Sequence, residues 1–277
     1  MKLNNKLTVY SPPFPRLRSY YDVIDFACEN GFTSVEPFCM FEFDTPDTEK
    51  AHKVKEYADK KGIVFPCFSV YATIMDTDIE EETEKLKGFA EVASILGSPY
   101  LHHTVVGQIK NPEAVVARKK ELLTDGINVV REVYDYAQSL GVKTVYEDQG
   151  YIFNGVNGFG EFLDKVDRNV GVVADFGNVC QSGDNIYDFV RAFHDKVVHA
   201  HIKDVIVTDE EVDGSFPALD GRYVQYVAIG KGELDCKGVI DLLKSYGYDG
   251  YYGLEYAVTD DNSPVIDEII KLVNTWL

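Results

Sequence analysis

The chain has 277 residues, of which 45% are apolar, and its 46 acidic side chains outnumber the 27 basic ones, giving a net charge of −19. This surplus argues against a nucleic-acid-binding protein, because duplex affinity depends on Lys and Arg that neutralise phosphates, and the chain has no Lys/Arg run to form a basic groove. Chains of about 300 residues bury about 75% of the surface that they expose when unfolded, so this apolar content predicts a folded protein and excludes disorder.

The N-terminal residues and the cysteines indicate the compartment. Residues 1–10 contain no apolar segment typical of a secretory signal, and no apolar run approaches the roughly 18 residues of a membrane helix. The five cysteines are scattered and include no Cys-x-x-Cys pair, which favours reduced thiols over a disulfide framework or a zinc site. We therefore expect a cytoplasmic protein that has no membrane contact.

Short apolar runs typical of strands alternate along the chain with amphipathic runs typical of helices. The runs that predict strands are residues 7–10, 34–37, 64–70, 100–104, 143–147, 171–175, 197–203 and 251–256. The helical patterns that follow them are residues 19–30, 48–61, 79–96, 112–140, 159–166, 186–194, 237–246 and 264–277. Five of the helical patterns end at a glycine suited to a C-terminal cap: Gly31, Gly62, Gly97, Gly141 and Gly247.

Eight strand-then-helix units predict an α/β fold, a (β/α)8 TIM barrel that forms a single domain over residues 1–277, since such barrels have about 250 residues. The competing fold is a doubly wound open sheet, which normally has a Gly-x-Gly-x-x-Gly turn after its first strand. Here that turn is Ser-Pro-Pro-Phe-Pro at 11–15, whose prolines lack the N–H groups that would bind a pyrophosphate. Residues 205–233 form a long irregular connection, which is typical of a functional lid.

The candidate active site lies at the carboxyl ends of the barrel strands, where enzymes of this fold carry their chemistry. Four late strands end in residues of metal-binding types: Glu147, Asp175, His201 and Glu255. Three carboxylates at one rim repel each other strongly unless a cation lies between them. Three carboxylate oxygens and one imidazole suit one divalent ion, Mn²⁺ with Mg²⁺ or Co²⁺ as alternatives, better than a structural zinc. A strand-end carboxylate is also a common helix N-cap, and Asp175 is the most open to that second interpretation.

Two pairs of histidines can be divided by the alternation of side chains along a strand. In the segment 197–204, His199 and His201 point into the barrel; His201 is nearer the mouth as the metal ligand, and His199 below it fits a core histidine equally well. In Tyr-Leu-His-His at 100–103 only one histidine can point inward. We expect it to be His102, as a substrate contact and not as a metal ligand.

Two further motifs are less specific. Glu36, at the end of the second predicted strand, has the right position for contact with a substrate hydroxyl. The Gly-Lys-Gly-Glu turn at 230–233 could be mistaken for a phosphate cradle. A lone Gly-x-Gly is a weak signal, however, and the turn fits at least as well as a cap of the helix that starts near Asp235.

Several of these motifs together resemble a known family. They are the eight-unit layout, Glu147, Asp-Phe-Gly-Asn at 175–178, His-Ala-His-Ile-Lys-Asp at 199–204, Ile-Gly-Lys-Gly-Glu-Leu-Asp at 229–235 and Tyr-Asp-Gly-Tyr-Tyr-Gly-Leu-Glu at 248–255. This combination resembles the sugar phosphate isomerase/epimerase superfamily of xylose isomerase-like TIM barrels, the AP endonuclease 2 type, over essentially the whole chain. The superfamily includes ketose 3-epimerases, hydroxypyruvate and inosose isomerases, inosose and dehydroshikimate dehydratases and an apurinic endonuclease branch.

The resemblance implies that Glu147, Asp175, His201 and Glu255 hold one divalent metal, which grips two neighbouring oxygens of a ketose or polyol and acidifies a C–H beside them. It also implies that Glu147 and Glu255 are the catalytic bases, one on each face of the substrate. Proton transfer through a metal-stabilised enediolate needs both the metal ion and the two bases. The expected function is therefore that of a metal-dependent sugar or polyol isomerase or epimerase.

Two departures from the family pattern concern the binding of substrate. Many relatives have a histidine at the position of Asn178, an amide that cannot act as acid or base, and the ketose epimerases have an arginine where this chain has Val207. Arg222, on the long connection, is a candidate replacement for that arginine, although a solvated surface position is its default. The expected substrate contacts are Asn178, His102, Glu36, Lys203 and Arg222.

The same enediolate could instead expel a β-leaving group, so the alternative is a metal-dependent lyase or dehydratase, of the inosose, dehydroshikimate or C-glycoside-cleaving kind. Elimination needs one further acid, for which Lys203, His102 and Tyr256 are candidates. An apurinic endonuclease would need three metals and additional histidines, and a barrel that only binds its ligand is the non-enzymatic alternative. The acidic surplus favours a neutral, non-phosphorylated sugar or polyol as partner. A homo-oligomer and an assembly with a partner subunit both stay open.

Overall fold

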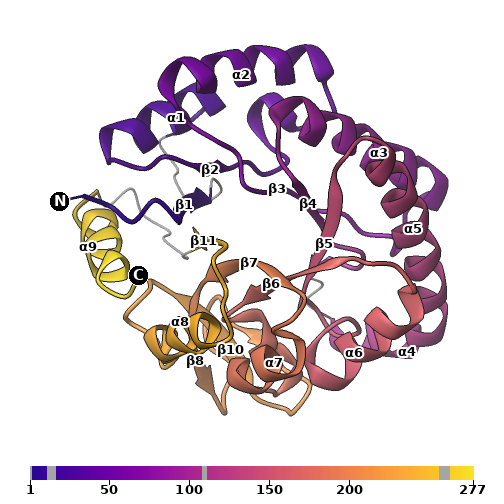
Figure 1. Cartoon of the computed structure of the whole chain (residues 1–277). Helices are drawn as coiled ribbons and strands as arrows, with labels where there is room; N and C mark the ends of the chain where they lie inside the picture. Colours follow the sequence, from indigo (N-terminus) through magenta and orange to yellow (C-terminus); the bar gives the residue numbers. More distant parts are fainter. Residues whose placement is uncertain (1, 11–16, 108–110, 256–262) are drawn as a thin grey trace.

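The computed structural model describes residues 2–10, 17–107, 111–255 and 263–277, and has eight parallel strands at its centre (Figure 1). They follow the spatial order β2-β1-β11-β7-β6-β5-β4-β3, and isolated parallel bridges at Ser34–Val64 and Phe38–Ser69 join the two edges. This arrangement confirms the predicted TIM barrel. The strands are β1 (Leu7–Tyr10), β2 (Val35–Glu36), β3 (Phe68–Val70), β4 (Tyr100–His103), β5 (Lys143–Glu147), β6 (Gly171–Asp175), β7 (Val197–Ile202) and β11 (Tyr251–Leu254).

Helices surround this barrel (Figure 1). Polar side chains start several of them, as Asp47 does for α2 by accepting the N–H of Lys50, and Gly62 ends α2 in the left-handed conformation at φ 72°. Among the described helices none is long and apolar enough to cross a membrane. The helices are α1 (Tyr20–Glu29), α2 (Thr48–Lys61), α3 (Ile79–Leu96), α4 (Pro112–Ala117), α5 (Lys119–Ser139), α6 (Gly155–Val166), α7 (Ile186–Phe193), α8 (Cys236–Ser245) and α9 (Ser263–Asn274), with 3-10 turns η1 (Phe41–Phe43) and η2 (Asn178–Ser182).

One predicted helix is divided in two. The pattern at 112–140 predicts a continuous helix, but Arg118 leaves helical geometry, with φ −102° and ψ 11°, and separates α4 from α5. Its guanidinium contacts Asp76 and Glu121, each at 2.7 Å. Periodicity could not reveal this break, because the apolar spacing continues across it.

The interior of the barrel changes from apolar to polar side chains towards its mouth. Cys67, Val145 and Val173 form a small buried apolar cluster. Two residues further along β3 and β5, on the same side of each strand, are the buried polar residues Ser69 and Glu147. The mouth end of the interior is therefore polar, and its groups must pair with one another, because an unpaired buried polar group is costly.

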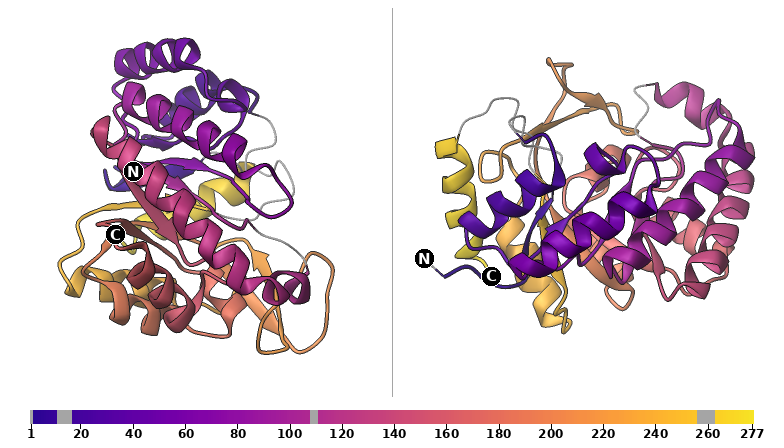
Figure 2. Two further views of the ribbon diagram at one scale, coloured as in Figure 1. Left: turned by 90° about the vertical axis from the view of Figure 1, so that its right-hand side faces the viewer. Right: turned by 90° about the horizontal axis from the view of Figure 1, so that it is seen from above.

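The connection at 205–233 is not irregular, contrary to the sequence prediction. It contains β8 (Asp204–Thr208), β9 (Phe216–Pro217) and β10 (Tyr223–Val227), which form an antiparallel sheet in the order β8-β10-β9. Valine, isoleucine and tyrosine residues suited to strands predominate in β8 and β10, and antiparallel pairing of the two strands satisfies their backbone groups. We call this sheet the lid; it projects from the barrel, in orange, in the right-hand view of Figure 2.

A buried carboxylate closes the base of the lid. Asp204 is 1% exposed, and its two oxygens accept backbone N–H groups at 2.9–3.2 Å. The glycine turn at 230–233 thus binds a carboxylate of the protein itself and is not free to bind a phosphate. Asp235 then caps α8 by accepting the N–H of Gly238 at 3.0 Å, in agreement with the capping interpretation. The donors to Asp204 are the N–H groups of Val205, Gly230, Gly232 and Leu234.

We expect Gly232→Ala to destabilise the protein, because a Cβ at this position would lie 2.1 Å from Oδ1 of Asp204. Overpacking of this kind costs about 1–3 kcal/mol. The matched control is Gly160→Ala in α6, where the nearest atom to a new Cβ is 3.7 Å away, on Phe193, and where alanine favours the helix. Calorimetry should show a lower melting temperature for Gly232→Ala alone. Equal melting temperatures for the two variants would contradict the proposed role of this turn.

Candidate metal and substrate site

Four side chains from neighbouring strands converge at the mouth of the barrel. Glu147 and Asp175 end β5 and β6, His201 lies one residue before the end of β7, and Glu255 directly follows β11. One potential ligand atom of each residue lies within 4.8 Å of those of the other three. The structure therefore brings the four predicted ligand residues together, and we call this group the mouth cluster.

His201 lies at the centre of the mouth cluster. Its Nδ1 is 3.3 Å from Oε2 of Glu147, 3.3 Å from Oε2 of Glu255 and 3.7 Å from Oδ2 of Asp175. His201 and Asp175 are fully buried, whereas the side chain of Glu255 is 24% exposed. The cluster is therefore accessible from the side of Glu255.

Asp175 acts as a capping residue with one oxygen and faces the mouth cluster with the other. Its Oδ1 accepts the backbone N–H groups of Gly177 and Asn178 at 2.9 and 2.8 Å, as a capping residue does. Its Oδ2 faces His201 and Lys203. Burial raises the pKa of Asp175, but the charge of Lys203 and the bond to His201 outweigh burial, so the pKa lies below its ordinary value and the carboxylate is ionised.

Among the described residues, Lys203 is the one Lys or Arg side chain in contact with these carboxylates. Its Nζ lies 2.7 Å from Oε1 of Glu255 and 3.1 Å from Oδ2 of Asp175, and it donates to Oδ1 of Asn178 at 3.1 Å. Burial lowers the pKa of Lys203, but Asp175 and Glu255 outweigh it and hold the pKa well above its usual value. A Cβ at position 177 would lie 3.0 Å from the Lys203 side chain, so Gly177 makes room for it.

The donor set of the mouth cluster fits a divalent cation. Three carboxylates share one imidazole nitrogen, and oxygen with imidazole donors suits hard or borderline ions such as Mn²⁺ and Mg²⁺. The Nε2 of His201 donates to Oε1 of Glu36 at 3.0 Å, so Nδ1 is the ring nitrogen that faces the carboxylates. Burial lowers the pKa of His201, but Glu36 and the mouth carboxylates outweigh burial and hold the pKa well above its usual value, so a metal ion would bind Nδ1 in place of a proton. Glu147, Asp175, His201 and Glu255 would hold such an ion.

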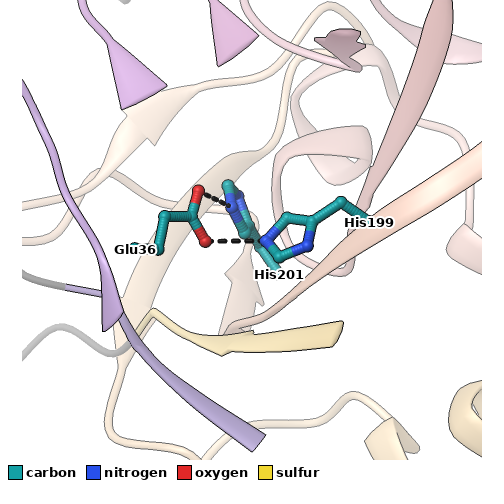
Figure 3. A group of neighbouring side chains, drawn as sticks. All are labelled: Glu36, His199 and His201. Atoms are coloured by element: carbon teal, nitrogen blue, oxygen red, sulfur yellow. Dashed lines mark hydrogen bonds and ion pairs between the residues drawn. The ribbon is translucent and has the colours of Figure 1, made fainter. Parts of the chain in front are cut away.

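Glu36 occupies a different position from the one predicted. It is fully buried beneath the mouth cluster, where its oxygens accept from Nε2 of His199 at 2.7 Å and Nε2 of His201 at 3.0 Å (Figure 3). The hydroxyl of Ser69 donates to Oε1 of Glu36 at 2.6 Å. A Cβ on Gly253 would lie 2.9 Å from Oε2 of Glu36, so this glycine allows the close approach. Glu36 therefore orients His201 from below and does not line the mouth.

The potential ligand atoms of Glu36, His199 and His201 also lie within 4.8 Å of one another. Their contacts are hydrogen bonds of ordinary length, and the three residues are at most 1% exposed. The two histidines and the hydroxyl of Ser69 together supply hydrogen-bond donors to both carboxylate oxygens of Glu36. We therefore interpret this group as support for His201.

The two histidines of β4 point to opposite sides, as alternation requires. His102 faces the interior, with Nδ1 3.0 Å from Oγ of Ser69 and Nε2 3.7 Å from Oε1 of Glu147. His103 faces the helices, where its ring accepts from the hydroxyl of Tyr146 at 2.7 Å. Burial lowers the pKa of His102 more than Glu147 raises it. The inward placement agrees with the expectation for His102, and its contact with substrate stays a prediction.

Arg222 does not reach the mouth cluster. Its guanidinium pairs with Asp220 at 2.7 Å on the lid, and its side chain is 46% exposed. The short-range pair with its neighbour keeps Arg222 at the surface, as the default interpretation held. A replacement for the arginine of the epimerases is therefore not found at this position.

Sequence reasoning missed two residues of the site. Tyr226, on β10 of the lid, donates to Oδ1 of Asn178 at 2.8 Å, and Nε2 of Gln181 lies 3.0 Å from its hydroxyl. Ser69 joins Glu36 to His102. Strand alternation could have identified Ser69, because it lies two residues after Cys67 on the inner face, but nothing in the sequence pairs Tyr226 with Asn178.

Comparison with known proteins gives consistent matches. A family model described as the xylose isomerase-like TIM barrel matches residues 24–276. Inosose isomerase of Halalkalibacterium halodurans is 29% identical over 180 residues, which are 64% of this chain and 59% of that protein. Inosose dehydratase of Clostridium perfringens is 25% identical over 225 residues, 76% of this chain and 73% of that one. The aligned segment thus spans about three-fifths of the isomerase.

Solved structures extend the match to the whole chain. D-psicose 3-epimerase of Clostridium cellulolyticum H10, determined with D-tagatose, superposes with a TM-score of 0.78 over 98% of this chain and 97% of that one. The two sequences are 16% identical. This likeness establishes the shared fold.

We expect Glu36→Gln to weaken the binding of Mn²⁺ by about 10–100-fold, because residues that orient a histidine ligand contribute this much to metal affinity. Titration followed by electron paramagnetic resonance measures the affinity directly and needs no activity. Glu132→Gln, on α5 at the surface, is the matched control and should bind as the wild type does. Unchanged affinity in a folded Glu36→Gln variant would contradict the role of Glu36.

We expect His103 to make the protein less stable in acid. Burial lowers the pKa of His103 to about 4, whereas the unfolded value is about 6.5. The unfolded chain therefore binds the proton first, and stability falls as the pH drops from 6.5 towards 4. The free-energy advantage of wild type over His103→Gln should shrink by about 2.5 kcal/mol between pH 7 and pH 4.5 in denaturant titrations. The matched control is the exposed His52→Gln variant, measured at the same pH values. A pH-independent advantage for His103 would refute this assignment.

Proposed function

The chain belongs to the xylose isomerase-like TIM-barrel family, and from this premise we propose that it is a divalent-metal-dependent isomerase or epimerase of a neutral sugar or cyclic polyol ketone. One observation carries the proposal: the carboxylates of Glu147 and Glu255 come from strands on either side of the β6–β7 pair and lie at the same distance from His201. This arrangement suits the delivery of acid and base to two sides of one substrate.

Isomerisation beside a carbonyl requires one group that removes a proton from carbon and another that returns a proton. One of the two side chains, Glu147 or Glu255, accepts the proton from carbon, and the other returns a proton to the opposite face; the reverse reaction exchanges these roles. A divalent ion, Mn²⁺ or alternatively Mg²⁺ or Co²⁺, would supply Lewis acidity towards the substrate carbonyl. Lys203 holds Glu255 in place through its contact at 2.7 Å.

A neutral substrate agrees with the charges around the site. The mouth cluster contains three carboxylates, and Lys203 is already paired with two of them. In the described part of the mouth cluster and its contacts, no further Lys or Arg is available to a phosphate or carboxylate group of a substrate. Inososes are neutral polyol ketones, and they occur in the names of two relatives, so they are the first compounds to test.

Elimination of water is the second candidate, favoured by the position of Lys203. The buried ammonium next to Glu255 is a proton source for a departing hydroxyl, which an isomerase does not need. One of the relatives is named as a dehydratase. Tyr256, the other candidate acid besides His102, lies outside the described residues.

The two reactions differ in the fate of deuterium. We expect the Mn²⁺-loaded protein, incubated with inososes and ketoses in D₂O, to exchange deuterium into the recovered substrate or its isomer. Glu147→Gln and Glu255→Gln should each lower kcat by about 10²–10⁴-fold, because each removes a positioned acid or base. Glu132→Gln is the matched control and should retain full activity. Loss of water in mass spectra would replace isomerisation by elimination, and a fully active Glu147→Gln/Glu255→Gln double variant would end the catalytic proposal.

A further inference from the structure

The interior hydrogen bonds fix where the proton of His102 resides. Oγ of Ser69 lies 2.6 Å from Oε1 of Glu36 and 3.0 Å from Nδ1 of His102. All three residues are at most 3% exposed, so water does not compete for these bonds. The hydroxyl of Ser69 has a single proton, so it can donate a hydrogen bond to Glu36 or to His102 but not to both.

Counting donors decides that choice. Glu36 also faces the ring nitrogens of His199 at 2.7 Å and His201 at 3.0 Å. A carboxylate approached by three donors acts as the acceptor for all of them, so Ser69 donates its proton to Glu36. The oxygen of Ser69 is then left to accept from His102, which places the proton of the neutral His102 ring on Nδ1.

The opposite nitrogen of the ring is consequently an acceptor without a donor. Nε2 of His102 is buried and has no hydrogen-bond partner among the described residues. The nearby polar atom is Oε1 of Glu147 at 3.7 Å, which as part of a carboxylate is an acceptor too. A buried acceptor of this kind is costly unless a donor is supplied from outside the protein.

We propose that Nε2 of His102 accepts a hydrogen bond from a substrate hydroxyl, one carried by the carbon next to the carbon at which Glu147 moves a proton. The inference rests on the proposed function and adds a substrate requirement to it. An oxygen within hydrogen-bond distance of Nε2 lies beside the Glu147 carboxylate, and only a hydroxyl can donate there. Keto, ether and deoxy groups at this position cannot donate.

The tautomer can be measured without substrate or metal. In protein labelled with ¹⁵N-histidine, long-range ¹H–¹⁵N spectra distinguish a ring protonated at Nδ1 from one protonated at Nε2, and the signal lost in His102→Asn assigns the residue. We expect the Nδ1–H form at neutral pH. The Nε2–H form would overturn the inference, because Nε2 would then be a donor.

Kinetics with a set of monodeoxy inososes test the role of the acceptor. We expect the wild type to lose about 10–100-fold in kcat/KM for one member of the set, since a buried acceptor built to bind a hydroxyl is left unpaired. His102→Asn keeps a donor for Ser69 but has no atom at the Nε2 position. With the parent inosose, the kcat/KM of His102→Asn should fall by a similar factor. Its kcat/KM values for the parent and for that deoxy compound should then differ by less than about 3-fold.

His102→Gln restores an amide oxygen near the position of Nε2 and should recover part of the discrimination. Mn²⁺ affinity should be the same in all three proteins, which a disrupted interior would not permit. Undiminished discrimination in His102→Asn would overturn the inference. If the wild type turns over no inosose or ketose, the proposed function fails, whereas a wrong tautomer in an active enzyme refutes this inference alone.

Discussion

Repulsion among buried carboxylates is the constraint on which the interior of this barrel depends. Glu147, Asp175 and Glu255 all face one nitrogen of His201, and Glu36 lies below the same ring. Burial, with the charges of Asp175 and Glu147, raises the pKa of the neighbouring Asp148 well above its usual value. Lys203 and the ring of His201 counter this negative charge at the mouth. A bound divalent ion satisfies the same demand more completely than one ammonium does.

The polar interior has two levels with different tasks. The upper level presents oxygen and nitrogen atoms to the mouth. The lower level, formed by Glu36, Ser69 and His199, fixes which nitrogen of each upper imidazole carries a proton. His201 thereby offers Nδ1 upward, and His102 offers Nε2. The chemistry at the mouth is thus set by hydrogen bonds that no substrate touches.

The sequence was sufficient for the barrel and for the strand-end residues, because both follow from periodicity. Eight alternating units require parallel strands, and parallel strands bring their carboxyl ends together. How deeply a side chain is buried in the barrel could not be predicted from periodicity. Glu36 ends a two-residue strand, and only the register of β2 beside β1 shows that its side chain is buried. The lid strands and the contact between Tyr226 and Asn178 depend on long-range pairing, which leaves no local signal. Arg222 was expected as a substrate contact, but it pairs with Asp220, only two residues away, and stays at the surface.

The hydrogen bonds of Asp204 have a consequence for how the lid can vary among proteins with this fold. One carboxylate at the first residue of the lid holds the turn at its far end, so the two points where the lid leaves and rejoins the barrel are fastened together. What lies between them can lengthen, shorten or change sequence while the barrel strands keep their positions. The lid is in this sense a replaceable insertion on a fixed barrel, and a change within it can alter the surroundings of the mouth while the four strand-end residues stay in place.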